Sequence, residues 1–274
     1  MPALDHESAP RISRLQMVPP DLTARRILDW AGLLNARDVG GLPPMHGGRI
    51  RPGALVRSDV LTRLTDEGRA ALVEHGVRTI VDVRSAGELA EDDVYPFAAD
   101  DEVVKYLNVP FSLGRDADAW AEIKARYERA ETREELNRID LDGHRAGLVA
   151  IARAVADAPP GGVLVHCHAG KDRTGLVIGL LLSLVGVADD QIADDYALTS
   201  LNFEPLIVEW LDRMTDDPRE RQRLRGLAEP RREVILDTLG YLRGRYGSAL
   251  EYLMAGGLEQ PYLDRLEARL VERP

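Results

Sequence analysis

Cysteine is almost absent from this 274-residue sequence, which holds only one, Cys167. A lone cysteine cannot form an intramolecular disulfide, so disulfides do not hold the fold together. Long apolar runs are missing too: the longest, residues 176–188, is interrupted by glycine and is too short to cross a bilayer. The N-terminus carries acids and prolines and lacks the apolar stretch of a secretory signal. We therefore expect a cytoplasmic protein with no integral membrane segment, with export by another route left open.

Positive charge is also scarce. Lys and Arg total 35 against 46 Asp and Glu, which gives a net charge of −11 at pH 7. General binding of nucleic acid requires a basic face, so the sequence predicts no nucleic-acid partner. The same charge opposes the approach of an anionic substrate, and positive groups at short range must overcome it. Hydrophobic residues make up 45% of the chain, which is enough for a substantial core.

The reactive side chains gather in one stretch, residues 166–175, with the sequence HCHAGKDRTG. An apolar, β-prone run at 161–165 predicts a buried strand before it, and an apolar run at 176–186 predicts a buried helix after it. The stretch is therefore a tight loop at a helix N-terminus, where unpaired N–H groups and the helix dipole favour an anion. Gly170 and Gly175 allow the loop to curl so that successive N–H groups point inward.

Arg173 and Cys167 add a phosphate clamp and a nucleophile to this loop. The planar guanidinium of Arg173 can bind two oxygens of a phosphate. A thiol has a pKa of about 8.5 and becomes more acidic at a helix N-terminus beside cations, so we expect Cys167 to be a thiolate aimed at the bound group. The alternative is that Cys167 is a small buried hydrophobic residue.

The loop fits neither an ATP-type phosphate loop nor a metal site. Asp172 stands where Ser or Thr would be needed, and Val165 stands where the leading glycine should be. The potential metal ligands at 166–168 are consecutive, so their side chains diverge, and no second pair at zinc spacing occurs. We expect no metal and no cofactor.

The loop sequence His-Cys-x-Ala-Gly-Lys-Asp-Arg-Thr-Gly resembles the signature of the cysteine-based protein tyrosine phosphatase superfamily. In this form it resembles a bacterial branch that acts on phosphotyrosine and often on phosphoinositides. Two earlier segments, Asn35–Gly41 and Arg57-Ser58-Asp59, are similar to stretches of the same branch. The resemblance implies metal-independent hydrolysis of a phosphate monoester in two steps: Cys167 attacks phosphorus to give a cysteinyl-phosphate, and water then releases phosphate.

The resemblance also implies roles for the residues around the nucleophile. Arg173 and the backbone N–H groups of residues 168–173 would hold the phosphate oxygens. Thr174 would donate a hydrogen bond to the Cys167 sulfur, and Lys171 could reach a second phosphate. His166 is expected to be structural. The residues predicted to bind substrate in the loop are His168, Ala169, Gly170 and Lys171.

The general acid is the least determined role. Relatives carry a mobile aspartate in the loop after the strand that corresponds to residues 102–110, but here no aspartate follows Pro110 directly. Asp172 is the first choice, since the branch has an aspartate at this position, and Asp116 is the second. The cationic neighbours of Asp172 should lower its pKa, which suits a base, and a bound phosphate dianion should raise it again. The alternative is that Asp172 only orients the adjacent arginine.

Polar residues at other strand ends and turns are further candidates. Asp82 and Arg84 end a β-rich run, and in open α/β sheets the working residues lie beyond the carboxyl ends of strands. They are predicted either to bind or support the phosphate site or to form a structural ion pair. Arg37 and Asp38 are interpreted as structural, and Arg57 fits either role equally well.

The expected fold is α/β: a single domain with a central, mostly parallel sheet flanked by helices and a helical C-terminal third. Residues 1–20 resemble a loose tail. The polar helical insertion at 117–158, with a break near 143–145, is either a lid over the site or a solvated helical hairpin. The other expected elements are a hairpin over 33–58, a helix at 65–75, and strands at 77–85 and 102–110.

The most direct functional interpretation is a protein-tyrosine phosphatase, whose partner is a phosphotyrosine protein. The alternatives are a phosphoinositide or dual-specificity phosphatase and a phosphate-binding pseudophosphatase, which the presence of Cys167, Arg173 and Thr174 disfavours. A sulfurtransferase or arsenate reductase also uses a loop cysteine, but most arsenate reduction schemes need further thiols. The sequence does not indicate an oligomeric state.

Overall fold

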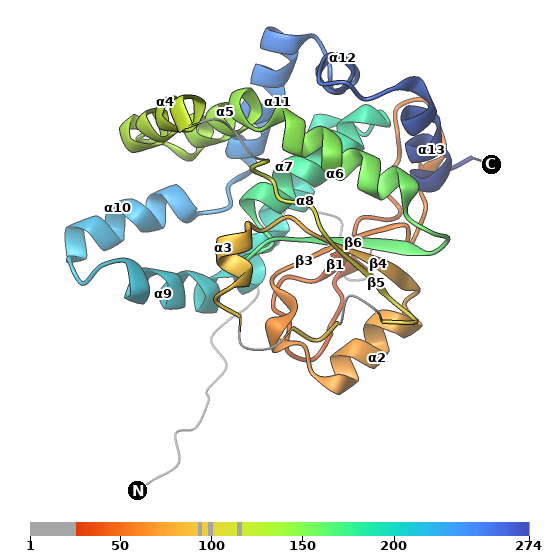
Figure 1. Ribbon diagram of the computed structural model, residues 1–274, viewed down its shortest axis with the longest axis horizontal. Coiled ribbons are helices and arrows are strands. Elements are labelled where there is room, and N and C mark those ends of the chain that lie inside the picture. Colours follow the sequence, from red (N-terminus) through yellow and green to blue (C-terminus); the bar gives the residue numbers. More distant parts are fainter. Residues whose placement is uncertain (1–25, 93–94, 98–100, 114–116, 274) are drawn as a thin grey trace, which may run out of the picture.

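The computed structural model describes residues 26–92, 95–97, 101–113 and 117–273 (Figure 1), so the expected tail at 1–20 lies outside it. At the centre is a five-stranded sheet with the order β1-β3-β6-β4-β5. β1 pairs antiparallel with β3, and the other neighbours are parallel, which confirms the expected α/β fold. The strands are β1 (Arg37–Asp38), β3 (Leu55–Ser58), β4 (Val77–Asp82), β5 (Lys105–Asn108) and β6 (Gly162–His166).

The central strands divide their apolar side chains between two cores. In β6, Val163 and Val165 belong to a large core and Leu164 belongs to a smaller one, and in β4 Val81 and Ile80 divide in the same way. This alternation follows from the two-residue period of a strand. Because both faces are covered, β6 is buried throughout, which explains why its sequence is a continuous apolar run.

Helices cover both faces of the sheet (Figure 1). Leu72 of α2 packs in the smaller core, whereas Ile151 of α6 and Leu181 of α7 pack in the large one. No helix of the described residues is long and apolar enough to cross a membrane. The covering helices are α2 (Asp66–Glu74), α6 (Arg145–Asp157), α7 (Asp172–Leu184), α8 (Asp189–Ala197), α11 (Arg232–Tyr246), α12 (Ala249–Ala255) and α13 (Gln260–Leu270).

Two boundaries show where local sequence signals succeed and fail. Thr65 caps α2 by accepting a hydrogen bond from the Gly68 N–H, as its position before two acids predicts. The predicted hairpin over 33–58 is confirmed: β1 pairs antiparallel with β3, and between them the Gly41 N–H donates to the Ile50 carbonyl oxygen and the Ile50 N–H donates to the Leu42 carbonyl oxygen. The local signals do not show a second pairing of the segment between β1 and β3. That segment pairs through β2 (Arg49–Ile50) with the C-terminal β7 (Val271–Glu272).

The insertion at 117–158 is not a lid as a whole. The expected break is present, since His144 separates α5 from α6. The buried face of α6, including Leu148 and Val155, packs in the large core, so this part of the lid prediction is wrong. The two helices before α6 are α4 (Ala117–Arg129) and α5 (Arg133–Gly143).

Two other helices, which we call the cover helices, project beside one end of the sheet (Figure 1). They are α9 (Phe203–Met214) and α10 (Pro218–Ala228). They form a small apolar cluster of their own around Ile207 and Leu211. The remaining short elements are α3 (Ala86–Leu89) and the 3-10 helices η1 (Leu61–Arg63) and η2 (Leu198–Asn202).

Candidate active site

The reactive loop joins β6 to α7 and is held from behind through its carbonyl groups. The Asn35 side-chain amide donates to the carbonyl oxygens of Ala169 and Gly170 at 2.9 and 3.2 Å. Arg57 Nη2 also donates to the Gly170 carbonyl oxygen, at 2.8 Å. Since the N–H and C=O of a trans peptide point in opposite directions, carbonyls bound on the far side turn the following N–H groups toward the front of the loop. This is the inward-facing arrangement that an anion requires.

The two loop glycines are required for different reasons. Gly170 has a φ of +64°, and a Cβ at this position would lie 2.2 Å from the Ser58 carbonyl oxygen of β3. Gly175 lies in the first turn of α7, which begins at Asp172 inside the loop and not after it. A Cβ on Gly175 would lie 2.7 Å from the Tyr196 ring. The first glycine therefore shapes the loop, and the second allows α7 to pack closely.

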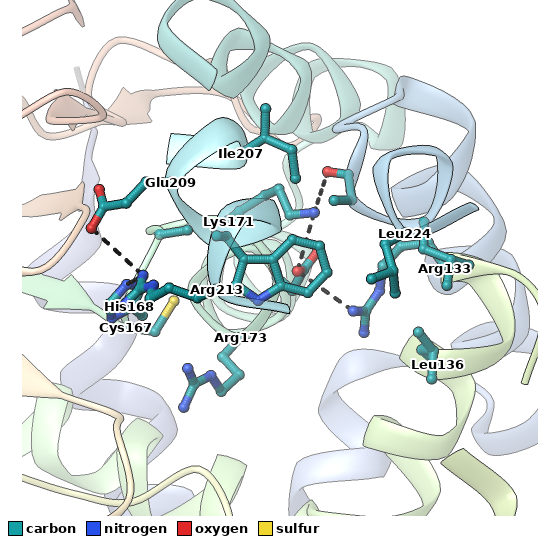
Figure 2. A pocket seen from close by; sticks show the side chains of 15 residues that line it. Arg133, Leu136, Cys167, His168, Lys171, Arg173, Ile207, Glu209, Arg213 and Leu224 are labelled. Carbon is teal, nitrogen blue, oxygen red and sulfur yellow. Dashed lines mark hydrogen bonds and ion pairs between the residues drawn. The ribbon is translucent and has the colours of Figure 1, made fainter. Parts of the chain in front are cut away.

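A cavity of about 330 Å³ opens at the front of the loop (Figure 2). Cys167 is only 3% exposed, and its side chain is one of the groups that line this cavity. The other walls come from α5 and from the two cover helices. Apart from the loop residues, the lining consists of Arg133 and Leu136 of α5, Ile207, Glu209, Trp210 and Arg213 of α9, and Leu224, Leu227 and Ala228 of α10.

The Arg173 guanidinium is fixed by Glu88, a residue that the sequence analysis missed. Its Nη1 and Nη2 each donate to one carboxylate oxygen of Glu88 at 2.7 Å. The Glu88 Oε2 atom also accepts from the N–H and the hydroxyl of Ser85 at 3.0 Å. Burial raises the pKa of Glu88, but these donors outweigh it and lower the pKa to about 2. Glu88 binds the guanidinium end-on, through Nη1 and Nη2. The side of the guanidinium that contains Nε therefore remains for phosphate oxygens.

Asp172 is surrounded by donors on the cavity wall. The Tyr196 hydroxyl donates to its Oδ1 at 3.0 Å, and Lys171 Nζ and Arg133 Nη1 lie 3.2 and 3.5 Å from its Oδ2. Burial raises the pKa of this carboxyl, but Arg133 and Lys171 outweigh it, so the pKa lies below its usual range. Asp172 is therefore ionised in the free protein, as its neighbours in the loop predict.

Thr174 does not make the hydrogen bond that the sequence predicts. Its hydroxyl is fully buried and makes no hydrogen bond with any described residue, so it does not donate to the Cys167 sulfur. A buried hydroxyl without a partner is unfavourable in a folded protein and commonly has a functional reason.

His168 and Lys171 connect the loop with the cover helices. Arg213 Nη2 of α9 lies 3.4 Å from His168 Nε2, and Lys171 Nζ donates to the Ala228 carbonyl oxygen at the end of α10. Burial and then Arg213 lower the pKa of His168. Lys171 is 4% exposed and engaged on two sides, so the structure offers it less readily to a second phosphate than the sequence suggests.

Asp82 and Arg84 do not line the cavity, which corrects their predicted place among the substrate-binding residues. Both are at most 1% exposed, and Arg84 donates to Asp82 Oδ2 through Nε and Nη2 at 3.0 and 2.8 Å. Asp82 Oδ2 lies 3.5 Å from His166 Nε2, and His166 Nδ1 lies 3.0 Å from the Cys167 carbonyl oxygen. The pair therefore supports, through His166, the strand end that carries Cys167.

Three arginines share one buried carboxylate behind the loop. Asp195 Oδ2 lies 2.7 Å from Arg57 Nη1, its Oδ1 lies 3.2 Å from Arg37 Nε, and Arg26 also pairs with it. Burial and the proximity of Arg57 lower the pKa of Arg37 to about 9. The excess of positive charge favours an anion at the front of the loop, against the negative charge of the whole protein. Asp195 gives no signal in the sequence, because its partners are distant along the chain.

Two further expectations concern Asp116 and metal binding. Asp116, the second candidate for the general acid, lies outside the described residues. Among the residues that the structure does describe, no cluster of three or more His, Cys, Asp or Glu side chains could hold a metal ion.

Comparison with known proteins places this site in a wider context. A family model described as the tyrosine phosphatase family matches residues 28–272. The triple specificity protein phosphatase PtpB of Mycobacterium tuberculosis is 29% identical over 279 residues, covering 89% of this chain and 99% of that protein. A tyrosine-protein phosphatase of Nostoc commune is 28% identical over 248 residues, covering 83% of this chain and 78% of that protein.

Proposed function

The chain belongs to the tyrosine phosphatase family and is a cysteine-dependent phosphatase, and from this premise we propose that it hydrolyses phosphotyrosine in proteins. We assign Cys167 as the nucleophile, Arg173 as the phosphate clamp and Asp172 as the general acid and base. The observation that supports these assignments is the shared cavity, which all three residues line at the N-terminus of α7.

The first step transfers the phosphoryl group to the enzyme. The Cys167 thiolate attacks phosphorus, and the bond between phosphorus and the tyrosine oxygen breaks. The loop N–H groups and the free edge of Arg173 bind the equatorial oxygens as charge moves onto them. The bound dianion raises the pKa of Asp172, so the carboxylate takes up a proton from solvent when substrate binds and then gives it to the leaving phenolate oxygen.

The second step releases phosphate. The Asp172 carboxylate takes a proton from a water molecule, whose oxygen attacks the phosphorus of the cysteinyl-phosphate. The bond between sulfur and phosphorus breaks, and the thiolate leaves with the electron pair. The Thr174 hydroxyl, which has no partner among the described residues, is the donor that we assign to the departing sulfur.

The walls of the cavity favour an aryl phosphate. Apolar side chains stand around the cysteine on three helices: Leu136 on α5, Ile207 and Trp210 on α9, and Leu224 on α10. An aromatic ring buries apolar surface against such walls, which stabilises binding by about 25 cal/mol per Å² removed from water. The side chains of phosphoserine and phosphothreonine are too small to bury as much surface. The shape and lining therefore support phosphotyrosine.

A phosphoinositide is the second candidate, and the charges at the cavity support it. Arg133 and Arg213 line the cavity in addition to Arg173, and further anionic groups on an inositol ring could bind them. Both arginines already have acidic partners, Asp172 and Glu209, so the charge available to a second phosphate is reduced.

Phosphate release by the wild type and by Cys167→Ser tests the proposal. The substrates are phosphotyrosine, phosphoserine and phosphothreonine peptides and monophosphorylated phosphoinositides, with EDTA present. We expect the highest kcat/KM on phosphotyrosine and no turnover by the serine variant. Higher kcat/KM on the lipids would favour the second candidate, and equal turnover by the serine variant would overturn the assignment of the nucleophile.

A change in the cavity wall tests the preference for an aryl group. Trp210→Ala should raise KM for phosphotyrosine roughly tenfold, because the ring loses part of its apolar contact. The matched control is Val208→Ala on the same helix, where the native side chain is 38% exposed and outside the cavity. Equal effects of the two substitutions would contradict the proposed binding mode.

A further inference from the structure

Arg133, the first residue of α5, contacts three groups at once. Its Nη1 lies 3.5 Å from Asp172 Oδ2 at the cavity, Nη2 donates to Asp140 Oδ2 at 3.2 Å, and Nε donates to Asn137 Oδ1 at 3.0 Å. Asn137 is itself held, because its amide donates to the Thr238 hydroxyl of α11 at 2.9 Å. The guanidinium is therefore anchored by Asp140 and Asn137 on its inner sides and approaches Asp172 through Nη1.

Asp140 is a second carboxylate on the inner side of Arg133, and the reaction described above does not use it. It is 6% exposed and lies on α5, away from the lining of the cavity. The Tyr127 hydroxyl of α4 donates to its Oδ1, and His144 Nε2 lies 3.9 Å from the same oxygen. The Tyr127 hydroxyl also lies 2.8 Å from His144 Nε2.

The charged groups around Asp140 determine its ionisation. Arg133 is the cation in direct contact, while Asp172 and Arg173 act from farther away. Burial raises the pKa of Asp140 to about 6, although Arg133 and Tyr127 oppose the shift. Asp140 is thus mostly ionised at neutral pH, and a small fall in pH protonates it.

We propose that Asp140 is a positioning residue for Asp172: the two carboxylates share Arg133, and the charge of Asp140 limits how strongly Arg133 keeps Asp172 ionised. This inference rests on the proposed role of Asp172 as general acid and base. An ionised Asp140 neutralises part of the positive charge that Arg133 presents to Asp172. Its own negative charge also lies behind Arg133 and repels the negative charge of Asp172. Both effects make it easier for Asp172 to hold the proton that the leaving group needs.

Removing the charge of Asp140 should therefore weaken the general acid. In Asp140→Asn, asparagine keeps one acceptor oxygen for Arg133, and its NH2 group can donate to the Tyr127 hydroxyl in place of the oxygen that this hydroxyl now contacts. The charge is gone, so the full charge of Arg133 acts on Asp172. The pKa of Asp172 then falls further, and less of the bound enzyme carries the proton at neutral pH. The loss is larger for the phenolate of tyrosine than for p-nitrophenolate, a weaker base that needs less protonation as it leaves.

Asp142→Asn is the matched control. Asp142 lies on the same helix, but its carboxylate pairs with Arg126 at 2.6 Å and accepts from the hydroxyls of Tyr241 and Tyr246 at 2.8 and 2.6 Å. Among the described contacts it shares no partner with Asp172. The substitution should therefore leave the catalytic pH profile unchanged.

The test combines kinetics with a direct titration. We would measure kcat against pH for the wild type and both variants, with a phosphotyrosine peptide and with p-nitrophenyl phosphate. Carboxyl ¹³C NMR would follow the titration of Asp172 in a Cys167→Ser background. For Asp140→Asn we expect the alkaline limb and the titration of Asp172 to move down by roughly one pH unit. We also expect a loss on the peptide of roughly tenfold at neutral pH, and a smaller loss on p-nitrophenyl phosphate.

The outcomes separate this inference from the proposed function. An Asp172 titration that is unchanged by Asp140→Asn would overturn the inference, whatever the activity. If Cys167→Ser were as active as the wild type, the proposed function would be overturned instead. The NMR titration would still show whether Asp140 affects the ionisation of Asp172. If Asp140→Asn fails to fold, Tyr127→Phe replaces it: loss of the donated hydrogen bond raises the pKa of Asp140, so a smaller shift of Asp172 in the same direction is expected, and no shift would contradict the coupling.

Discussion

At the scale of single residues, the site depends on carboxylates that do not touch the substrate. Glu88 fixes Arg173, Asp195 fixes Arg57 behind the loop, and Asp82 fixes Arg84 beneath it. Each pair orders a cation before the phosphate arrives. Groups that are ordered in advance need not reorganise as charge develops, which is how electrostatic stabilisation becomes effective in an active site.

Glu88→Gln tests this ordering at Arg173. Glutamine has one acceptor oxygen and no charge, so it cannot bind both Nη atoms as the carboxylate does. The guanidinium then loses its fixed orientation, and we expect kcat/KM for phosphotyrosine to fall roughly ten- to a hundredfold. Steady-state kinetics would measure the change.

Ser85→Ala is the control for Glu88. It removes the cap of the short helix α3 and one hydroxyl donor to Glu88, but it keeps the Ser85 N–H donor and both contacts between Glu88 and Arg173. The expected cost is about 1 kcal/mol of stability with nearly wild-type kinetics. Equal kinetic losses in the two variants would show that activity depends on the integrity of α3 and not on the ion pair between Glu88 and Arg173.

Asp140 predicts a pH dependence of stability. Its pKa rises from 3.8 to about 6 in the fold, so folding favours the protonated carboxyl. The unfolded state therefore loses this proton first, and the contribution of Asp140 to stability falls as the pH rises from about 4 to about 6. Urea unfolding of the wild type and of Asp140→Asn should show the wild type losing stability relative to the variant over this window. A constant difference would contradict the shift.

The sequence carries enough information to bring together the residues that we assign to the reaction, but not to find their partners. Cys167, Asp172 and Arg173 lie within one short loop, so their spacing and the helix start place them together. Glu88 and Arg133 reach the same site from distant parts of the chain, and no local pattern reports such contacts. The capping box of Ser85 and Glu88 is readable as a helix start, but it says nothing about Arg173.

At the scale of elements, the loop lies so close to β3 that no side chain fits at Gly170. Gly170→Ala would place a Cβ against the Ser58 carbonyl oxygen in a backbone conformation that alanine avoids. The loop must then shift, and its N–H groups leave their positions. We expect kcat to fall at least about a hundredfold, since small misplacements at a reacting centre cost this much.

Gly240→Ala is the control for this glycine. Gly240 lies inside α11, is exposed and has open space where the Cβ would go. Alanine is the better helix former there, so we expect unchanged kinetics and a gain of about 0.5–1 kcal/mol. Wild-type activity in Gly170→Ala would show that the loop does not need this contact.

Secondary structure is predicted correctly where a short sequence signal specifies it. It is predicted poorly where the composition of a long segment hides the character of one helix within it. The strand before the loop and the cap of α2 follow from short signals, and both are present. The insertion at 117–158 is polar on average, which hides the apolar face of α6. The cover helices α9 and α10 lie far along the chain from the loop, so their place at the cavity becomes visible only in the fold.

At the scale of the whole molecule, the net charge of −11 works against the substrate. Repulsion at long range is screened by salt, whereas the contacts inside the cavity are screened much less. We expect kcat/KM for an acidic phosphotyrosine peptide to rise about twofold as salt increases from low ionic strength to about 0.15 M. A basic peptide of the same length should show the opposite trend. The same salt dependence for both peptides would argue against long-range repulsion.

The most direct test of the mechanism is to detect the phosphorylated enzyme. A rapid-quench reaction with a phosphotyrosine peptide, followed by mass spectrometry of the digested protein, locates any transferred phosphoryl group. The mechanism predicts a transient phosphoryl group on the peptide that contains Cys167, formed before phosphate release and absent in Cys167→Ser. Phosphate release by the wild type with no such adduct at any time point, or an adduct on another residue, would contradict it.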